Sequence, residues 1–231
     1  MIKIENVDVY GWEAAIRGMR NPMNSWDKSD SYHGCGEVLC GECRYDARCR
    51  TQFPSAHYEV GDNDLKLMKS LSQAGTDHSK FLRMINVTCD ITAPLYWWKE
   101  FDTYKVGTVA NSCSTMHKIH DKEFTLDDFS HEKLIKHEPI PGRIYSPLGM
   151  LNATIGNLNS FREMFLETND KRWWEQMIQL LPSSYNQKRT VQLNYQVLKS
   201  MYFARKSHKL DEWRTFCEWV ETLPYFKEII L

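Results

Sequence analysis

The sequence lacks long apolar stretches and has no excess of charge of either sign. No run in its 231 residues approaches the roughly 18 apolar residues of a membrane-spanning helix, so none is expected. The opening stretch, MIKIENVDVYGWEAAIRGM, has no apolar core of the signal-peptide kind, which predicts a cytoplasmic protein. The 29 Lys and Arg residues nearly balance the 30 Asp and Glu residues, giving a net charge of −1. Such a balance does not favour non-specific binding to nucleic acid or to anionic membranes.

The sequence also lacks internal repeats and any strict nucleotide-binding motif such as a Walker loop. Its composition is that of a globular protein, with 42% hydrophobic and 13% aromatic residues. A chain of this length buries a full core without help from disulfides or metals. We therefore expect one domain over residues 1–231, with a Cys-rich insert at residues 31–60.

Apolar periodicity predicts a helix-rich α+β fold. Strict alternation predicts a strand at residues 2–10, and a β-branched run predicts another at residues 85–92. Apolar residues spaced by three and four predict helices at residues 12–19, 62–74, 95–105, 151–167, 171–181, 189–205 and 210–223. The helix at 189–205 has the clearest stripe, formed by Val191, Tyr195, Leu198 and Tyr202.

Residues 93–120 change in character from aromatic to small and polar. The polar part contains Gly107, Thr108, Asn111, Ser112, Ser114 and Thr115. One interpretation is a loop that cradles a phosphate or nucleotide. A glycine allows close backbone approach, hydroxyl and amide groups supply hydrogen bonds, and Lys105 adds a charged contact. The alternative is a capped turn between two elements.

Four of the seven cysteines lie close together, at Cys35, Cys40, Cys43 and Cys49. The Cys40-Gly-Glu-Cys43 pair has the spacing of a zinc knuckle, and a metal would help a polar segment to fold. We predict a structural zinc site. An iron–sulfur cluster and free thiols are the alternatives. Disulfides are disfavoured in a cytoplasmic protein.

The order of several short motifs resembles that of the flavin-dependent thymidylate synthases. The stretch from Gly75 to Ser79 resembles the family's Gly-His-x-Ser/Thr turn, and a strand, a helix and then the polar loop follow it. Arg17-Gly-Met-Arg20 resembles the Arg-x-x-Arg of the first helix. Leu181-Pro182 with Tyr185 resembles the Leu-Pro…Tyr turn, and Asn194 and Arg205 match residues of the family's long helix.

The resemblance implies methylation of dUMP to dTMP by an FAD enzyme, with methylene-tetrahydrofolate and NADPH as co-substrates, in a homotetramer. It implies cofactor-binding roles for His78, Tyr104, Lys105, Thr108 and Asn194. It implies substrate-binding roles for Asn111, Ser112, Ser114 and Arg205, and assigns Ser114 and Arg205 as catalytic.

The chain departs from the family pattern at several arginines. Thr103-Tyr104-Lys105 stands where the family has Arg-His-Arg, and Gln196 stands where it has a flavin-side arginine. Each guanidinium contributes bidentate contacts that a lysine does not reproduce. The alternative function is therefore a protein that keeps the fold with lost or altered chemistry, either another pyrimidine nucleotide modification or a nucleotide-binding, regulatory role.

Overall fold

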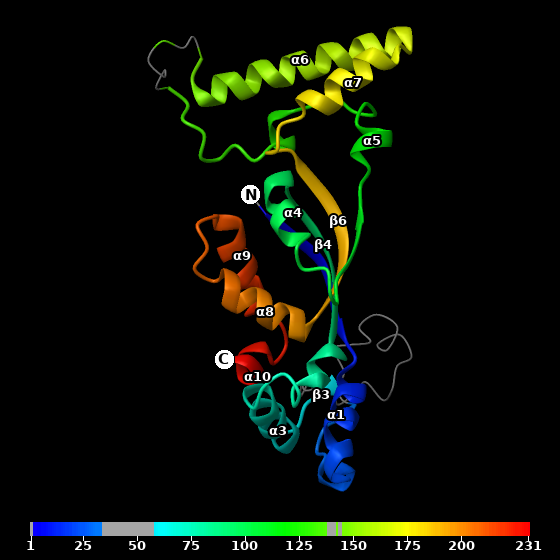
Figure 1. Cartoon of the computed structure of the whole chain (residues 1–231), viewed down its shortest axis with the longest axis vertical. Helices are drawn as coiled ribbons and strands as arrows, with labels where there is room; N and C mark the ends of the chain where they lie inside the picture. Colours follow the sequence, from blue (N-terminus) through cyan, green and yellow to red (C-terminus); the bar gives the residue numbers. More distant parts are fainter. Residues whose placement is uncertain (1, 34–57, 138–141, 143–144) are drawn as a thin grey trace, which may run out of the picture. The chain divides into compact units, whose positions relative to one another are not determined.

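The computed structural model describes residues 2–33, 58–137, 142 and 145–231 (Figure 1). The strands are β1 Lys3–Tyr10, β2 Tyr32–His33, β3 Tyr58–Glu59, β4 Asn86–Pro94, β5 Val109–Ser112 and β6 Asn186–Asn194. The helices are α1 Trp12–Arg20, α3 Asp62–Gln73, α4 Leu95–Phe101, α5 Thr115–Lys118, α6 Pro147–Thr168, α7 Lys171–Leu180, α8 Tyr195–Arg205, α9 Asp211–Val220 and α10 Phe226–Ile230. Short 3-10 helices are η1 Asn21–Met23, η2 Trp26–Lys28, η4 Lys80–Arg83 and η5 Leu126–Asp128. The predicted mixture of helices with a sheet is confirmed.

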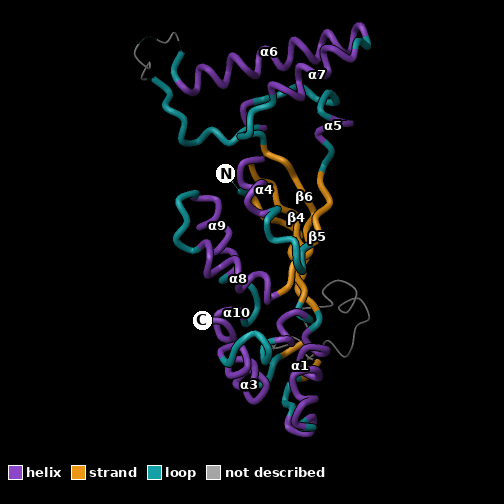
Figure 2. Tube along the Cα trace, viewed as in Figure 1, coloured by secondary structure: helices purple, strands orange, loops and turns teal. Residues whose placement is uncertain are grey.

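The chain forms two compact units. Unit 1 comprises Met1–Glu5, Asp90–Thr103 and Ala110–Thr190, and unit 2 comprises Asn6–Cys89, Tyr104–Val109 and Val191–Leu231. Four strands form a sheet in the order β1-β4-β6-β5, and each of them contributes residues to both units. Figure 2 draws the strands in orange. The two short strands β2 and β3 form a separate antiparallel pair in unit 2, with Tyr32 opposite Glu59. His33 and Tyr58 therefore lie side by side, although they are far apart in the sequence.

In unit 1, most of the packing involves α4 and the hairpin formed by α6 and α7. Trp97 and Trp98 of α4 are buried, as expected for core residues, and their rings meet edge to face at 4.9 Å. One side of α6 presents Leu151, Ile155 and Leu158 to a cluster that includes Met177 of α7. The Oγ atom of Ser146 accepts a hydrogen bond from the backbone of Gly149 and caps α6. This cap and Pro147 explain why α6 begins four residues before its predicted start.

In unit 2, α8 and α9 pack together, and α10 packs on α3. The core is strongly aromatic. Trp12 meets both Tyr195 and Tyr225 edge to face at 5.4 Å, and Tyr195 in turn contacts Phe226 at 5.6 Å. Aromatic pairs in this geometry add to the stabilisation from apolar burial. The first residue of α8 is thus fixed at the centre of this unit.

The prediction of one helix over residues 189–205 is wrong in its first third. Residues up to Asn194 belong to strand β6, and α8 begins at Tyr195. Val191 and Leu193 are buried while Thr190 and Gln192 are exposed, which is the period of two of a strand. Val191 also fits the helical stripe, so the pattern alone did not separate the two structures.

The predicted helix at 95–105 ends early, and the polar loop after it has its own structure. Helix α4 stops at Phe101, followed by a turn at Asp102 and Thr103. The loop contains strand β5 and the single-turn helix α5. No helix in the described part of the chain is both long enough and apolar enough to cross a membrane.

Candidate functional site

Six residues predicted to bind the cofactor or the nucleotide belong to unit 2, and four of them meet around the turn at residues 104–108: Tyr104, Thr108, Asn194 and Arg205. Gly107 has a left-handed φ of +78° and lies so close to Asn194 that an added Cβ would stand 2.8 Å from its Nδ2 atom. The Thr108 hydroxyl donates to the carbonyl oxygen of Tyr104 and closes the turn. The Tyr104 hydroxyl accepts a hydrogen bond of 2.9 Å from Nε of Arg205. Tyr104 and Arg205, which are far apart in the sequence, therefore belong to one cluster of side chains.

Asn194 has a local structural role that the sequence prediction missed. Its Oδ1 atom accepts a hydrogen bond of 3.0 Å from the backbone N–H of Val197 and so caps α8. A cap at this position explains why the strand changes directly into a helix here. Gly107 lies close to this cap and to the Val197 side chain. The close backbone approach that its lack of a side chain allows is therefore an approach to α8.

Arg205 is the last residue of α8 and lies against two aromatic rings. Its guanidinium carbon is 4.9 Å from the centre of the Trp213 ring and 5.6 Å from that of Tyr104. Trp213 is fully buried in α9 and was not among the predicted site residues. Only its position on the apolar stripe of the 210–223 helix is readable from sequence, and that position indicates a core residue.

Hydrogen bonds of other polar residues in unit 2 connect α8 to the preceding elements. Lys199 donates to the carbonyl oxygen of Ser72 at 2.6 Å, which closes the end of α3, and burial lowers the pKa of this lysine. The Ser79 hydroxyl donates to Oε1 of Gln196 at 3.2 Å. His78 and Lys105 are exposed. Lys105 is thus a solvent-accessible cation beside Tyr104.

The residues predicted to bind the substrate, other than Arg205, lie in unit 1. Asn111 and Ser112 end strand β5, whose four residues are all exposed. The next residues are fixed to β6, because the Cys113 N–H donates to the Lys188 carbonyl at 3.0 Å and Gln187 donates to the Cys113 carbonyl at 2.9 Å. Ser114 accepts a hydrogen bond of 3.0 Å from the His117 N–H and caps α5. This part of the loop is a capped turn that still presents exposed polar groups.

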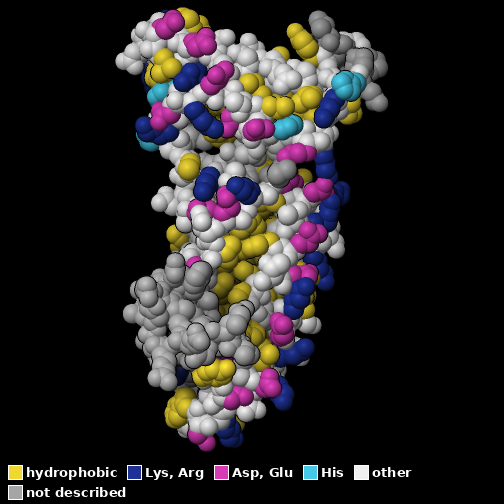
Figure 3. Space-filling view, turned by 180° about the vertical axis from the view of Figure 1, so that it is seen from behind, with side chains coloured by type: hydrophobic (Ala, Val, Ile, Leu, Met, Phe, Trp, Pro, Cys, Tyr) yellow, Lys and Arg dark blue, Asp and Glu magenta, His cyan; other side chains and the backbone are white. Residues whose placement is uncertain are grey.

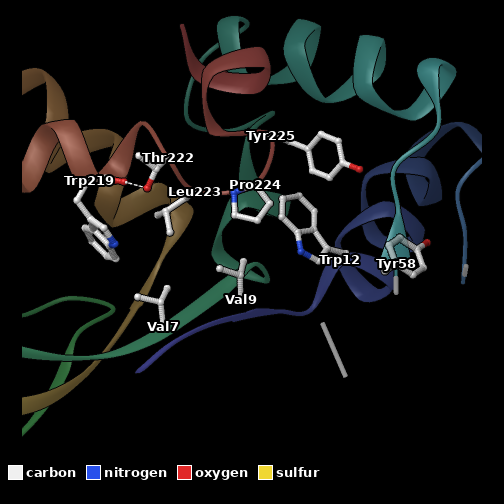
Figure 4. A pocket seen from close by; sticks show the side chains of 9 residues that line it. All are labelled: Val7, Val9, Trp12, Tyr58, Trp219, Thr222, Leu223, Pro224 and Tyr225. Carbon is white, nitrogen blue, oxygen red and sulfur yellow. Dashed lines mark hydrogen bonds between the residues drawn. The ribbon is translucent and has the colours of Figure 1, made fainter. Parts of the chain in front are cut away.

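A hollow of about 380 Å³ lies elsewhere in unit 2 (Figure 4). Aromatic and aliphatic side chains line it: Val7, Val9, Trp12, Tyr58, Trp219, Thr222, Leu223, Pro224 and Tyr225. None of the predicted site residues is among them.

The predicted metal ligands, Cys35, Cys40, Cys43 and Cys49, lie outside the described residues. Among the residues that are described, no group of three or more His, Cys, Asp or Glu side chains is arranged to hold a metal ion. On the face shown in Figure 3, Lys and Arg side chains are interspersed with Asp and Glu side chains, as the balanced composition predicts.

Comparison with solved structures shows a fold shared over the whole chain. Thymidylate synthase X (ThyX) from Helicobacter pylori, crystallised with FAD and dUMP, superposes with a TM-score of 0.63 at 14% identity, covering 100% of this chain and 97% of that chain. The UMP/dUMP methylase PolB from Streptomyces cacaoi, bound with 5-Br dUMP, gives a TM-score of 0.61 at 14% identity, covering 99% of this chain and 94% of that chain. No protein-family model and no curated protein matches the sequence. The chain therefore has the fold of the flavin-dependent thymidylate synthases.

Proposed function

We propose that the protein is a flavin-dependent enzyme that methylates the uracil ring of a pyrimidine nucleotide, most simply dUMP to dTMP. Methylene-tetrahydrofolate would supply the carbon, and FAD reduced by NADPH would supply the hydride. The observation that supports this proposal is the agreement of fold, over nearly the full length of both chains, with two proteins crystallised with uracil nucleotides. The clustering of Tyr104, Thr108, Asn194 and Arg205 in unit 2 is a second, independent support.

The donor set of unit 2 fits an anionic, heteroaromatic cofactor. Lys105 and His78 are exposed and offer N–H donors for the diphosphate of FAD. Tyr104 and Thr108 shape the turn that carries Lys105, and Asn194 lies against this turn. FAD supplies the redox chemistry, and these residues orient it and exclude water.

For the nucleotide, we assign Arg205 to the phosphate and Asn111 and Ser112 to hydrogen bonds with the base or sugar. Ser114 is assigned as catalytic with Arg205, since its O–H remains a donor while its oxygen caps α5. The family likeness implies a site completed between subunits of a homotetramer. The exposure of all four β5 residues is compatible with such an arrangement.

The test is reconstitution of the purified protein with FAD, followed by reaction with dUMP, methylene-tetrahydrofolate and NADPH. We expect a flavin absorbance spectrum and a product heavier than dUMP by one methyl group, measured by mass spectrometry. A protein that binds neither FAD nor dUMP would refute the proposal.

A second candidate function is modification of a different pyrimidine nucleotide, or nucleotide binding without chemistry. It is favoured by Thr103-Tyr104-Lys105 at the position of the family's Arg-His-Arg, because fewer guanidiniums weaken contacts to a dianion. Mass spectrometry of ligands that co-purify with the protein separates the two candidates. Recovery of dUMP with conversion to dTMP supports the first, and recovery of another nucleotide without that conversion supports the second.

We also propose a structural zinc ion held by Cys35, Cys40, Cys43 and Cys49, supported by their spacing alone. Metal analysis is expected to give about one zinc per chain, and Cys40→Ser is expected to lower this value. The matched control is Cys113→Ser, because Cys113 is an exposed cysteine in unit 1. Unchanged zinc content in Cys40→Ser would contradict the assignment, and iron in place of zinc would indicate a cluster.

A further inference from the structure

The Tyr104–Arg205 hydrogen bond joins a residue assigned to the cofactor with a residue assigned to the nucleotide. The family pattern has a basic residue where this chain has Tyr104, so the contact belongs to this chain. Three observations define its geometry: the hydrogen bond of 2.9 Å from Nε of Arg205 to the phenol oxygen, the position of the guanidinium carbon over the Trp213 ring at 4.9 Å from its centre, and the edge-to-face contact of the two rings at 6.1 Å.

Together these contacts fix the plane of the guanidinium. The Nε–H bond lies in that plane, so a hydrogen bond at Nε sets the rotation of the group. The Trp213 ring, which is fully buried, lies under the group and limits its tilt. Arginine recognises phosphate through a planar fork of donors, so a fixed plane determines the direction in which an anion is bound.

Tyr104 is itself held in place. The Thr108 hydroxyl closes the turn onto the Tyr104 carbonyl oxygen, and Gly107 packs on the cap of α8. The phenol is half-buried, and its position is set from both ends of a turn of five residues. While its oxygen accepts from Arg205, the phenol keeps its own O–H as a donor.

We infer that Tyr104 is a positioning residue, whose hydroxyl orients the guanidinium of Arg205 to receive the phosphate of the nucleotide. The inference rests on the proposed function, because it requires a uracil nucleotide as the ligand. It assigns to Tyr104 a role on the nucleotide side of the site, in addition to its assignment beside the flavin.

The experiment compares the binding of dUMP and of deoxyuridine, which lacks the phosphate, to the FAD-loaded full chain by calorimetry. Tyr104→Phe removes only the hydroxyl. Because a hydrogen bond to a charged group is lost, we expect the Kd for dUMP to rise about tenfold and the Kd for deoxyuridine to stay unchanged. In an Arg205→Lys background, Tyr104→Phe should have no further effect on dUMP.

The matched control is Tyr202→Phe, at a position on α8 that precedes Arg205 by one turn. Its hydroxyl donates to Oε1 of Glu221 at 2.7 Å and so belongs to a comparable contact away from the turn at residues 104–108. This variant should leave both dissociation constants unchanged. If Tyr104→Phe weakens dUMP and deoxyuridine equally, or weakens neither, the positioning role is overturned while the proposed function stands. If the wild-type protein binds no dUMP, the proposed function fails and the inference fails with it.

Discussion

Asp64→Ala is expected to lower the free energy of unfolding by about 3–5 kcal/mol, because it leaves the buried Arg20 without its countercharge. Asp64 is 0% exposed and Arg20 is 4% exposed, so water does not replace the lost partner. The ion pair joins the last residue of α1 to the first turn of α3, with 2.6 Å between Nε and Oδ1. Its loss therefore affects how two helices of unit 2 are held together.

The same carboxylate organises residues 29–31, which follow η2. Its Oδ2 atom accepts hydrogen bonds from the hydroxyls of Ser29 and Ser31 at 2.7 Å and 2.6 Å, and from the N–H groups of Asp30 and Ser31 at 3.2 Å. Arg20 also donates to the Ser25 and Lys28 carbonyls, each at 3.1 Å. Removing Asp64 takes the acceptor from the buried Arg20 and from the donors of residues 29–31 at once, and such networks lose more stability than a single contact.

The matched control is Glu13→Ala, which removes an ion pair on the exposed side of α1. Glu13 and Arg17 are 3.8 Å apart, and both side chains are more than half exposed. We expect a change of at most about 1 kcal/mol there, since surface pairs are screened by water. Urea unfolding followed by tryptophan fluorescence measures both variants. Equal, small losses in the two variants would show that the Asp64 network contributes no more than a surface pair.

The Asp64 effect should depend on pH. Burial raises the pKa of Asp64, but hydrogen bonds from Ser31, Ser29 and Arg20 outweigh it, so the pKa lies below its ordinary value. A carboxyl group with a lowered pKa in the folded state stabilises the fold above its unfolded-state pKa, and this contribution is lost as the pH falls through the folded-state pKa. The stability difference between wild type and Asp64→Ala should therefore be full near neutral pH and shrink below about pH 3.9, the ordinary pKa of an aspartate. A difference that grows on acidification would contradict this assignment.

Sequence periodicity predicted the long elements well where one period was present. The helices at 62–74 and 171–181 were placed to within a residue, as α3 and α7, because each has a single apolar face and a clear end. At residues 189–205 the pattern failed, because a strand passes directly into a helix and Val191 satisfies both periods. The change occurs at Asn194, where a cap hydrogen bond decides the structure, and capping of this kind is read from sequence only once the boundary is known.

Of the residues that the family resemblance names, the structure brings four together in unit 2, whereas Asn111, Ser112 and Ser114 lie in unit 1. The order of motifs put Tyr104, Thr108, Asn194 and Arg205 in one site, and the structure brings them together in unit 2. The partner that fixes Arg205, Trp213, was not predicted. It is a buried aromatic residue on a helix stripe, and nothing in its local sequence distinguishes contact with an arginine from ordinary core packing.

Gly107→Ala is expected to destabilise the protein and to weaken nucleotide and FAD binding together. Two costs add at this position. A left-handed φ of +78° costs an L residue about 1–2 kcal/mol. The new Cβ would also stand 2.8 Å from Nδ2 of Asn194 and 2.9 Å from Cγ2 of Val197, and overpacking of this kind costs about 1–3 kcal/mol.

Gly75→Ala separates these two costs. Gly75 also has a left-handed φ, +109°, but an added Cβ there meets nothing within 4 Å. The Gly75→Ala variant should therefore lose only the stability that the left-handed φ costs. Urea unfolding measures this loss. If the two variants lose the same stability, the close approach of Gly107 to α8 is not what holds the turn. If Gly107→Ala loses more, and loses ligand affinity where Gly75→Ala does not, then the 104–108 turn must rest against the cap of α8 for Tyr104 to reach Arg205.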